Sequence, residues 1–303
     1  MRRAGIKLSA VIDEYYTSLA YRSLAPITQK DYRYCLDAML ATQLNRVKFA
    51  VANIGTVTPP HAQAAYNIWA ERGVSFANHT LAVSSKVWNY AIQLGYTELN
   101  PFSKVSRRPH RPRKMVWTRE DINLFLTTAY SQFRWRSVGL IVQMAYEWCQ
   151  RLGDMANLTW DKYDFDKRVL YLEQSKRRAK VELPTTDELH EMLVQQQEEV
   201  GFQPYVAPVC YSNRILSIPY TKHNLSMSAR NVMRAAGLPE DLQIMDMRRT
   251  GTTEMVDAGV TMAQIMSVTG HANPQSVKPY LKNTLTSAKN AATLRFNTAS
   301  DTV

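Results

Sequence analysis

The stretch Thr261–Tyr280 reads TMAQIMSVTGHANPQSVKPY and carries a histidine and a tyrosine nine residues apart, His271 and Tyr280. On one continuous helix this spacing would place the two side chains about 13 Å apart and on opposite faces, because each residue rises about 1.5 Å and turns about 100°. The chain must therefore bend between them. We predict two short helices that hold these polar side chains at their ends.

The signals for this bend are local. Thr261 and Gln264 have the spacing of a capping box, and an apolar stripe leads from them to Gly270, which is typical of a helix end. Asn273 followed by Pro274 is a cap and first-turn pair that begins a second helix.

Pro279 directly precedes the tyrosine and has no backbone amide hydrogen. A proline disfavours helical angles at the residue before it, here Lys278, so we expect the segment that carries Tyr280 to be locally broken and mobile. The alternative is that Pro279 starts a new helical turn in a fixed position.

The composition is that of a globular protein with a polyanionic partner. With 303 residues, of which 45% are hydrophobic and 21% charged, the chain can bury the cores of two domains. The net charge of +11 favours nucleic acid over an acidic membrane as the partner. The first residues lack the apolar run of a signal peptide, and the apolar stretch around Val138–Tyr146 is too short to span a bilayer, so we expect no membrane role.

The sequence shows no motif for a metal or a cofactor. The three cysteines are far apart in sequence and have no CxxC spacing, so we predict that they are reduced core residues of a cytoplasmic protein: Cys35, Cys149 and Cys210. There is no HExxH, no GxxxxGK[ST] loop, no GxGxxG after a strand and no GxSxG elbow. We therefore expect neither a metal site nor a cofactor.

Residues 1–103 are predicted to form a small helical domain. Its apolar residues keep helical spacing in segments that begin near Leu8, Pro26 and Pro59, and in one that passes through Leu81. The fold class that we expect for the whole chain is mainly α with a small antiparallel β-sheet.

A basic linker at 104–116 follows, in which prolines oppose both helix and central strand. It is either a solvated tether or an extended segment that lies along a phosphate backbone and releases counterions. Its basic residues, with two more from a later turn, are the candidate DNA contacts: Lys104, Arg107, Arg108, Arg111, Arg113, Lys114, Arg177 and Arg178.

Residues 117–283 are predicted to form the second domain, and 284–303 a polar tail. The domain opens with a helix capped at Thr118, and two later strands, Val169–Leu172 and Val181–Leu183, form a hairpin. Helices return from Thr185 onward. The hairpin turn carries Lys176.

Four motifs occur in an informative order: Arg151 in QRLGDM, Lys176 in a QSK at a strand end, Arg248 in MDMRRT, and the final GHANPQSVKPY. This order resembles the tyrosine recombinases, the phage integrase family of DNA strand-transfer enzymes. The resemblance covers the whole chain, and YLEQSKRRAKVELPT is particularly similar to the hairpin of lambdoid phage integrases. It implies that the first domain binds the DNA core site and that the second is catalytic.

The resemblance also implies the catalytic residues, which are Arg151, Lys176, Arg248, His271 and Tyr280. Asp154 matches a supporting carboxylate, and Met245 stands where the family usually has histidine. Attack of a tyrosine oxygen on a phosphodiester builds negative charge, which two arginines can meet as bidentate cations. The lysine would protonate the departing 5′ oxygen, and the histidine would bind the phosphate or help remove the tyrosine proton.

The product implied is a 3′-phosphotyrosyl bond, which preserves the energy of the phosphodiester, so rejoining needs no ATP. Methionine can neither donate a proton nor carry charge, so we interpret Met245 as a weakened phosphate contact. Two alternatives stay open: a recombinase-like protein that binds DNA but cuts it poorly, and a type IB topoisomerase, which relaxes DNA without exchanging partners.

The resemblance further implies a cytoplasmic protein that assembles as a homotetramer on double-stranded DNA, with accessory DNA-bending proteins as further partners. We expect the tail to dock onto a neighbouring subunit through Ala291, Leu294 and Phe296. The first domain begins near Leu8, which leaves no room before it for the arm-binding domain of many phage integrases, so we expect either a simple recombinase or a truncated chain.

Overall fold

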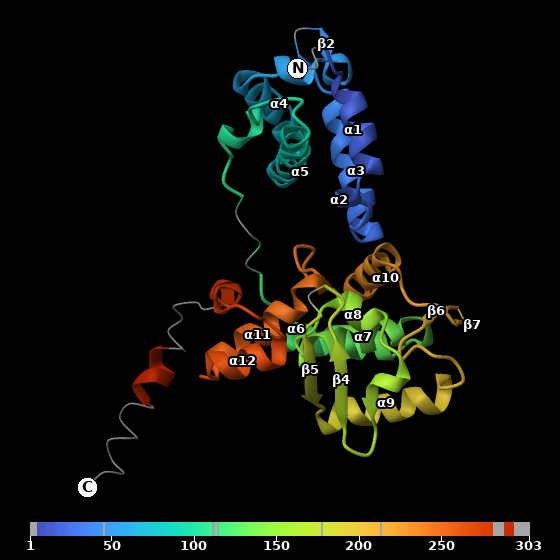
Figure 1. Ribbon diagram of the computed structural model, residues 1–303. Coiled ribbons are helices and arrows are strands. Elements are labelled where there is room, and N and C mark those ends of the chain that lie inside the picture. The colour runs from blue at the N-terminus through green and yellow to red at the C-terminus, as the bar shows by residue number, and fades with distance from the viewer. Residues whose placement is uncertain are drawn as a thin grey trace. The chain divides into compact units, whose positions relative to one another are not determined.

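A computed structural model of the chain is shown in Figure 1. It describes residues 5–44, 46–110, 113, 115–176, 178–212, 214–280 and 288–293. The chain separates into two compact units, Met1–Arg113 and Lys114–Val303, so the boundary falls inside the predicted basic linker.

The first unit is helical, as the apolar spacing predicts. Its helices are α1 (Leu8–Thr17), α2 (Leu19–Arg22), α3 (Pro26–Ala41), α4 (Pro59–Arg72) and α5 (Val74–Gln93). Short elements connect them: the hairpin of β1 (Gln43–Leu44) and β2 (Val47–Lys48), and the 3-10 turns η1 (Phe49–Val51), η2 (Ile54–Thr56) and η3 (Pro101–Lys104). Prolines begin α3 and α4, where a missing amide hydrogen costs nothing.

The first part of the predicted linker is held on the first unit. Phe102 is buried, and its ring centroid lies 4.8 Å from that of Trp88. Further along, the Arg108 amide donates to the Tyr66 hydroxyl over 2.7 Å, and Asn78 Nδ2 donates to the Arg108 carbonyl over 3.2 Å. The backbone up to this point is therefore fixed to α4 and α5.

The second unit is organised around α7 (Phe133–Glu147), in which every residue from Ser137 to Ala145 is buried. This helix packs against several others in Figure 1. The other labelled helices of this unit are α6 (Arg119–Tyr130), α8 (Leu152–Ala156), α9 (Asp187–Val200), α10 (Lys222–Ala235), α11 (Met247–Asp257) and α12 (Met262–Thr269). Residues 288–293 are also helical. The predicted cap at Thr118 is confirmed, since its hydroxyl accepts the Asp121 amide hydrogen.

Two small antiparallel sheets flank these helices. The first has the order β3 (Tyr163–Asp164), β4 (Val169–Glu173), β5 (Lys180–Pro184), and the second pairs β6 (Val209–Tyr211) with β7 (Arg214–Leu216). The predicted hairpin of β4 and β5 is confirmed, with Leu172 opposite Val181 on the buried face. The fold class is therefore mainly α with small antiparallel sheets.

The chain bends after α12, as the opening stretch predicts. The capping box at Thr261 forms, and Gly270 ends the helix with a left-handed φ of 66°. Asn273 then caps η6 (Pro274–Ser276), so the expected second short helix is a single 3-10 turn. A further turn, η7 (Lys278–Tyr280), follows η6 closely. Two other 3-10 turns lie elsewhere in this unit, η4 (Trp160–Lys162) and η5 (Ile244–Asp246).

The expectation that Lys278 leaves helical geometry is wrong, because this residue opens η7. The Tyr280 amide donates to the Val277 carbonyl over 2.9 Å, so Pro279 lies inside a new 3-10 turn that is separate from η6. The expected mobility of this segment stays a prediction. Within the described ranges, no helix is long and apolar enough to cross a membrane.

Candidate active site

Arg151 is placed by a sharp turn at the end of α7. Cys149 adopts a left-handed φ of 51°, and Arg151 then becomes the N-cap of α8, with its carbonyl accepting the amide hydrogens of Asp154 and Met155. Arg151 Nη1 lies 3.6 Å from Asp154 Oδ2. The other oxygen of this buried carboxylate accepts the amide hydrogen of Ser175 over 3.2 Å, which connects α8 to the hairpin turn.

A pair of fully buried glutamines connects Arg151 to the end of α12. Gln174 Oε1 accepts from Arg151 Nη1 over 2.9 Å, while its Nε2 donates to Gln150 Oε1 over 2.6 Å and to the Thr269 carbonyl over 2.8 Å. Gln150 Nε2 in turn donates to the Val268 carbonyl over 2.8 Å. Buried amides with every bond made fix the relative positions of the elements that they join.

The same packing explains the glycine that precedes the histidine. A Cβ on Gly270 would lie 2.6 Å from Gln174 Nε2, closer than side chains can approach. Its φ of 66° is also one that other residues adopt only at a cost. A glycine at position 270 therefore permits both the left-handed end of α12 and the close approach of Gln174.

Arg248 and His271 meet at the end of α12. Arg248 Nη2 donates to the Thr269 carbonyl over 2.7 Å and lies 3.2 Å from His271 Nε2. The Thr269 hydroxyl donates to the Ile265 carbonyl over 2.6 Å, so it accepts from His271 Nδ1, 2.7 Å away. This assigns the proton of the neutral imidazole to Nδ1 and turns the Nε2 lone pair towards the guanidinium.

The Arg248 guanidinium is only partly satisfied by the protein. Its Nη1 is buried and makes no hydrogen bond of ordinary geometry with the described residues, although Tyr280 is close enough to interact with the guanidinium. Burial lowers the pKa of Arg248, and the nearby Arg151 cation lowers it further, while Tyr280 acts in the opposite direction. A buried cation with an unused donor beside a second cation is a site that favours an anion.

Tyr280 lies beside Arg248 and His271. Its ring centroid is 6.0 Å from that of His271, and the guanidinium carbon of Arg249 lies 5.5 Å from the Tyr280 centroid. The ring also packs against a small apolar cluster of Val256, Ile265 and Val277. The structure thus brings Arg151, Arg248, His271 and Tyr280, which are far apart in sequence, into one site.

The side chains of Lys176 and Met245 are more exposed to solvent than the buried residues around Arg151 and Arg248. Lys176 is exposed in the turn after β4, and its place near the site follows from its neighbours Gln174 and Ser175, which are bonded to Arg151 and Asp154. Met245 lies on η5 with 60% of its surface exposed. Neither side chain is part of the bonded group around Arg248.

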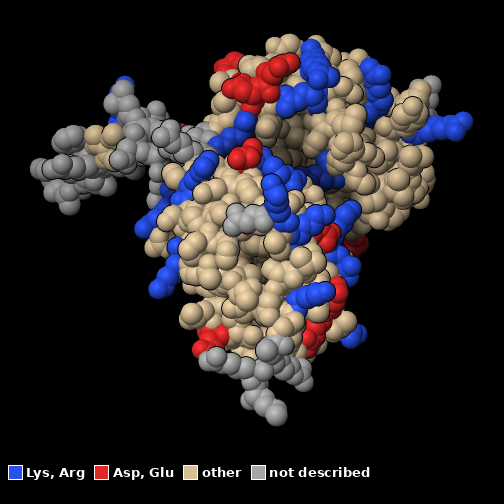
Figure 2. All heavy atoms as spheres, turned by 90° about the horizontal axis from the view of Figure 1, so that it is seen from above, with Lys and Arg blue, Asp and Glu red and all other residues tan. Residues whose placement is uncertain are grey.

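The candidate DNA contacts are mostly accessible where they are described. Lys104, Arg107, Arg108 and Arg178 are exposed and Arg113 is half-buried, while Arg111, Lys114 and Arg177 lie outside the described residues. Arg178 Nη1 donates to Glu173 over 3.2 Å, so its charge is partly engaged. On the face in Figure 2, Lys and Arg side chains are more widespread than Asp and Glu, in keeping with the net charge.

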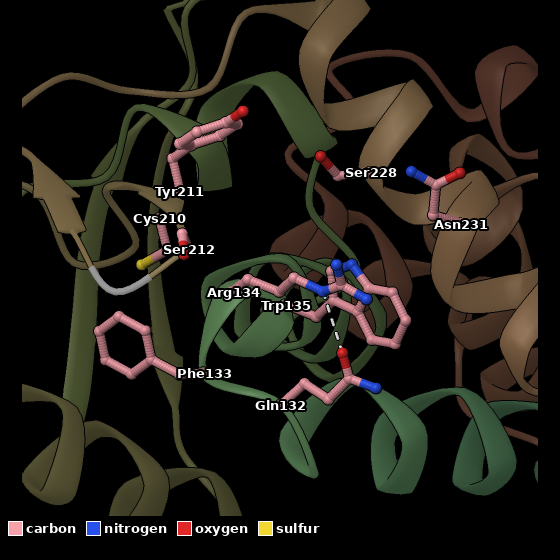
Figure 3. Close-up of a pocket in the computed structure, with 9 residues that line it drawn as sticks. All are labelled: Gln132, Phe133, Arg134, Trp135, Cys210, Tyr211, Ser212, Ser228 and Asn231. Carbon is pink, nitrogen blue, oxygen red and sulfur yellow. Dashed lines mark hydrogen bonds between the residues drawn. The ribbon is translucent and has the colours of Figure 1, made fainter.

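A separate hollow lies at the β6–β7 hairpin, with a volume of about 700 Å³ (Figure 3). Its walls include Arg134, whose guanidinium carbon lies 4.4 Å from the centroid of Trp135 and whose Nε donates to Gln132 over 2.9 Å. None of the candidate catalytic residues lines it. This pocket is therefore separate from the group of candidate catalytic residues.

Sequence reasoning missed Gln150, Gln174 and Thr269. Gln150 directly precedes Arg151, and Gln174 opens the QSK motif, so both lay within motifs that had already been singled out. Nothing in the sequence shows that these amides are buried, because their partners come from distant segments.

Comparison with known proteins identifies the class. The sequence profile of the phage integrase family matches residues 116–286, which is more than half of the chain. The chain therefore belongs to the phage integrase family, and its class is that of site-specific recombinases. No curated protein matches the chain.

Solved structures share the fold across both units. A lambda integrase dimer bound to a COC′ core site is 19% identical, with a TM-score of 0.76, over 92% of this chain and 78% of the integrase chain. A lambda integrase tetramer bound to a Holliday junction is 18% identical, with a TM-score of 0.76, over 93% and 79%. The Tn1549 transposon integrase in complex with circular intermediate DNA is 15% identical, with a TM-score of 0.76, over 96% and 99%.

Proposed function

We propose that this recombinase cleaves and rejoins double-stranded DNA through a covalent 3′-phosphotyrosyl link to Tyr280, for integration or excision of a phage or mobile element. The observation that carries the proposal is the arrangement of Tyr280 beside Arg248, whose buried Nη1 makes no hydrogen bond of ordinary geometry with the described residues. A phosphodiester oxygen has the charge and geometry to accept that donor.

The geometry supports a division of roles. Arg151 and Arg248 stabilise the charge that develops on the phosphoryl oxygens, and Asp154 orients Arg151 from 3.6 Å. His271 turns the Nε2 lone pair towards Arg248, so it can take the proton of the attacking phenol once the phosphate has displaced this contact. Lys176, in the hairpin turn, is the candidate acid for the leaving 5′ oxygen.

The bond to Tyr280 keeps the energy of the phosphodiester, so rejoining requires no ATP and no cofactor. The proposed partners are double-stranded DNA with attachment or core sites, three further copies of this chain, and accessory DNA-bending proteins. We place the protein in the cytoplasm of a bacterium or host cell, on DNA. The tail contacts through Leu294 and Phe296 lie outside the described residues, whereas Ala291 lies in a described helical segment, 288–293.

Two assays distinguish the possible activities. The DNA site is first selected from random duplexes by binding, and is then placed once in a supercoiled plasmid and twice in a paired-site substrate. Recombinant products from the paired sites support the proposal. Relaxation without recombinants indicates a type IB topoisomerase, and binding with neither product indicates a regulatory DNA-binding protein.

We predict that Met245→His increases the rate of covalent complex formation by at least about tenfold. The exposed position leaves room for an imidazole, which becomes a cation as pH falls below about 6.5, so the gain grows towards lower pH. Met245→Ala is the control and gives no gain. Equal rates for the histidine and alanine variants across this pH range would show that position 245 does not reach the phosphate.

We predict that Gln174→Ala reduces the cleavage rate by about tenfold to a hundredfold, because Arg151 and the Thr269 carbonyl each lose a buried partner. Affinity for the selected duplex is expected to stay nearly unchanged, since exposed basic residues supply most of it. Gln196→Ala is a matched control, because this glutamine is also buried and donates to the Val206 carbonyl away from the site. Equal losses of activity in both variants would mean that only stability had changed.

A further inference from the structure

A cluster of metal-ligating side chains lies in the first unit, far in sequence from the recombinase motifs. Asp31 and Cys35 are four residues apart on α3 and so share one face of that helix. His79 comes from α5, which packs against α3. One ligand atom from each of the three residues lies within 4.8 Å of the other two. The sequence gives no sign of this cluster, because the cysteine and the histidine are distant and form no spaced motif.

The donor set fits a particular class of ion. A thiolate, an imidazole and a carboxylate together favour a borderline divalent transition metal such as Zn²⁺ over Mg²⁺ or Ca²⁺, which prefer oxygen alone. With zinc bonds of about 2.0 Å to nitrogen and oxygen and about 2.3 Å to sulfur, tetrahedral ligands lie about 3.3 to 3.6 Å apart. The present separations, 2.5 Å between His79 Nε2 and Asp31 Oδ2 and at most 4.8 Å within the set, lie on either side of these values, so the side chains must move by up to about 1 Å to bind the ion.

The two flexible ligands can make the remaining adjustment. His79 Nε2 lies 2.5 Å from Asp31 Oδ2, and these side chains are 48% and 46% exposed, so the ion has an open path. Without an ion they form an exposed hydrogen bond, which contributes little to stability and is readily exchanged for metal ligation.

The third ligand is fixed from within the domain. Cys35 is buried, with 1% of its surface exposed, and burial raises the pKa of its thiol, whereas the Thr80 hydroxyl beside it favours the thiolate. That hydroxyl is itself buried and has no hydrogen-bond partner of ordinary geometry among the described residues. A metal-bound thiolate would accept its hydrogen, as partners around metal ligands commonly do.

We infer that Asp31, Cys35 and His79 bind one Zn²⁺ ion, with water in the fourth position, and that this ion links α3 to α5 in the first unit. The site is independent of the chemistry at Tyr280. Binding displaces the thiol proton and replaces the hydrogen bond between His79 and Asp31 with two bonds to the ion.

The test uses the full chain after treatment with a chelator. We expect one equivalent of Zn²⁺ to bind and to raise the melting temperature, since an ion that binds only the folded state stabilises it. Co²⁺ in place of Zn²⁺ is expected to give sulfur-to-metal charge-transfer absorption. Asp31→Asn and His79→Asn are each expected to weaken Zn²⁺ binding more than about tenfold. Removing a metal ligand lowers metal affinity at least as much as removing a residue that only hydrogen-bonds to a ligand.

His223→Asn is the matched control, since this histidine is exposed on α10 in the other unit, and it is expected to bind as the wild type does. Cys35→Ser is expected to remove the charge-transfer absorption. The inference is overturned if the chain binds no stoichiometric Zn²⁺, if Asp31→Asn and His79→Asn bind as tightly as wild type, or if the cobalt form shows no sulfur band.

Discussion

Tyr280→Phe is expected to abolish the covalent link between protein and DNA while leaving affinity for the DNA site unchanged. Phenylalanine keeps the ring that packs on Val277 and lies 6.0 Å from the His271 ring, so the fold of this segment is preserved. What is lost is the oxygen that forms the bond to phosphorus, and no other group at this position can replace it.

The measurement is direct. A nicked duplex whose short leaving strand diffuses away traps the covalent complex, which is then detected with labelled DNA on a denaturing gel. Tyr211→Phe is the matched control, because this tyrosine is 75% exposed in the same unit and lies on β6, outside the site. An adduct that persists in Tyr280→Phe would assign the nucleophile to another residue.

Local signals in the sequence were sufficient to predict the elements that carry the site. The capping box at Thr261, the glycine at 270 and the cap at Asn273 each act within a few residues, and each forms as predicted. The hairpin of β4 and β5 could also be predicted, because strands of five residues are long enough to show alternating burial.

Short or irregular elements could not be predicted in the same way. Strands β6 and β7 have three residues each, which is too few to show alternation, and the type of helical turn at Pro274 depends on packing more than on the cap. The assignment of DNA binding to residues 1–103 stays a prediction.

The hydrogen bonds that connect the residues of the site could not be predicted from the sequence. Gln174 joins Arg151 to the Thr269 carbonyl, across segments separated by up to 95 positions. A glutamine in a polar motif is as compatible with an exposed turn as with a buried one. Only the three-dimensional packing of α8, β4 and α12 shows that it is buried.

Arg248→Ala is expected to reduce the cleavage rate by about a hundredfold or more, which corresponds to about 3 kcal/mol of lost transition-state stabilisation. The change removes the cation whose Nη1 is available to a phosphoryl oxygen, and it also removes the donor that faces His271 Nε2. Arg248→Lys keeps a charge but loses the planar fork, so we expect an intermediate rate.

Affinity separates this effect from a general loss of DNA binding. Each phosphate contact adds about one to the magnitude of the slope of log K against log salt concentration. Arg248→Ala is therefore expected to weaken affinity slightly and to reduce the magnitude of this slope by about one. Arg249→Ala is the comparison, since this neighbour on α11 contacts the Tyr280 ring instead of the bonded group around His271. Because it leaves Arg248 in place, it is expected to reduce cleavage much less; equal losses in the two variants would remove Arg248 from the phosphate site.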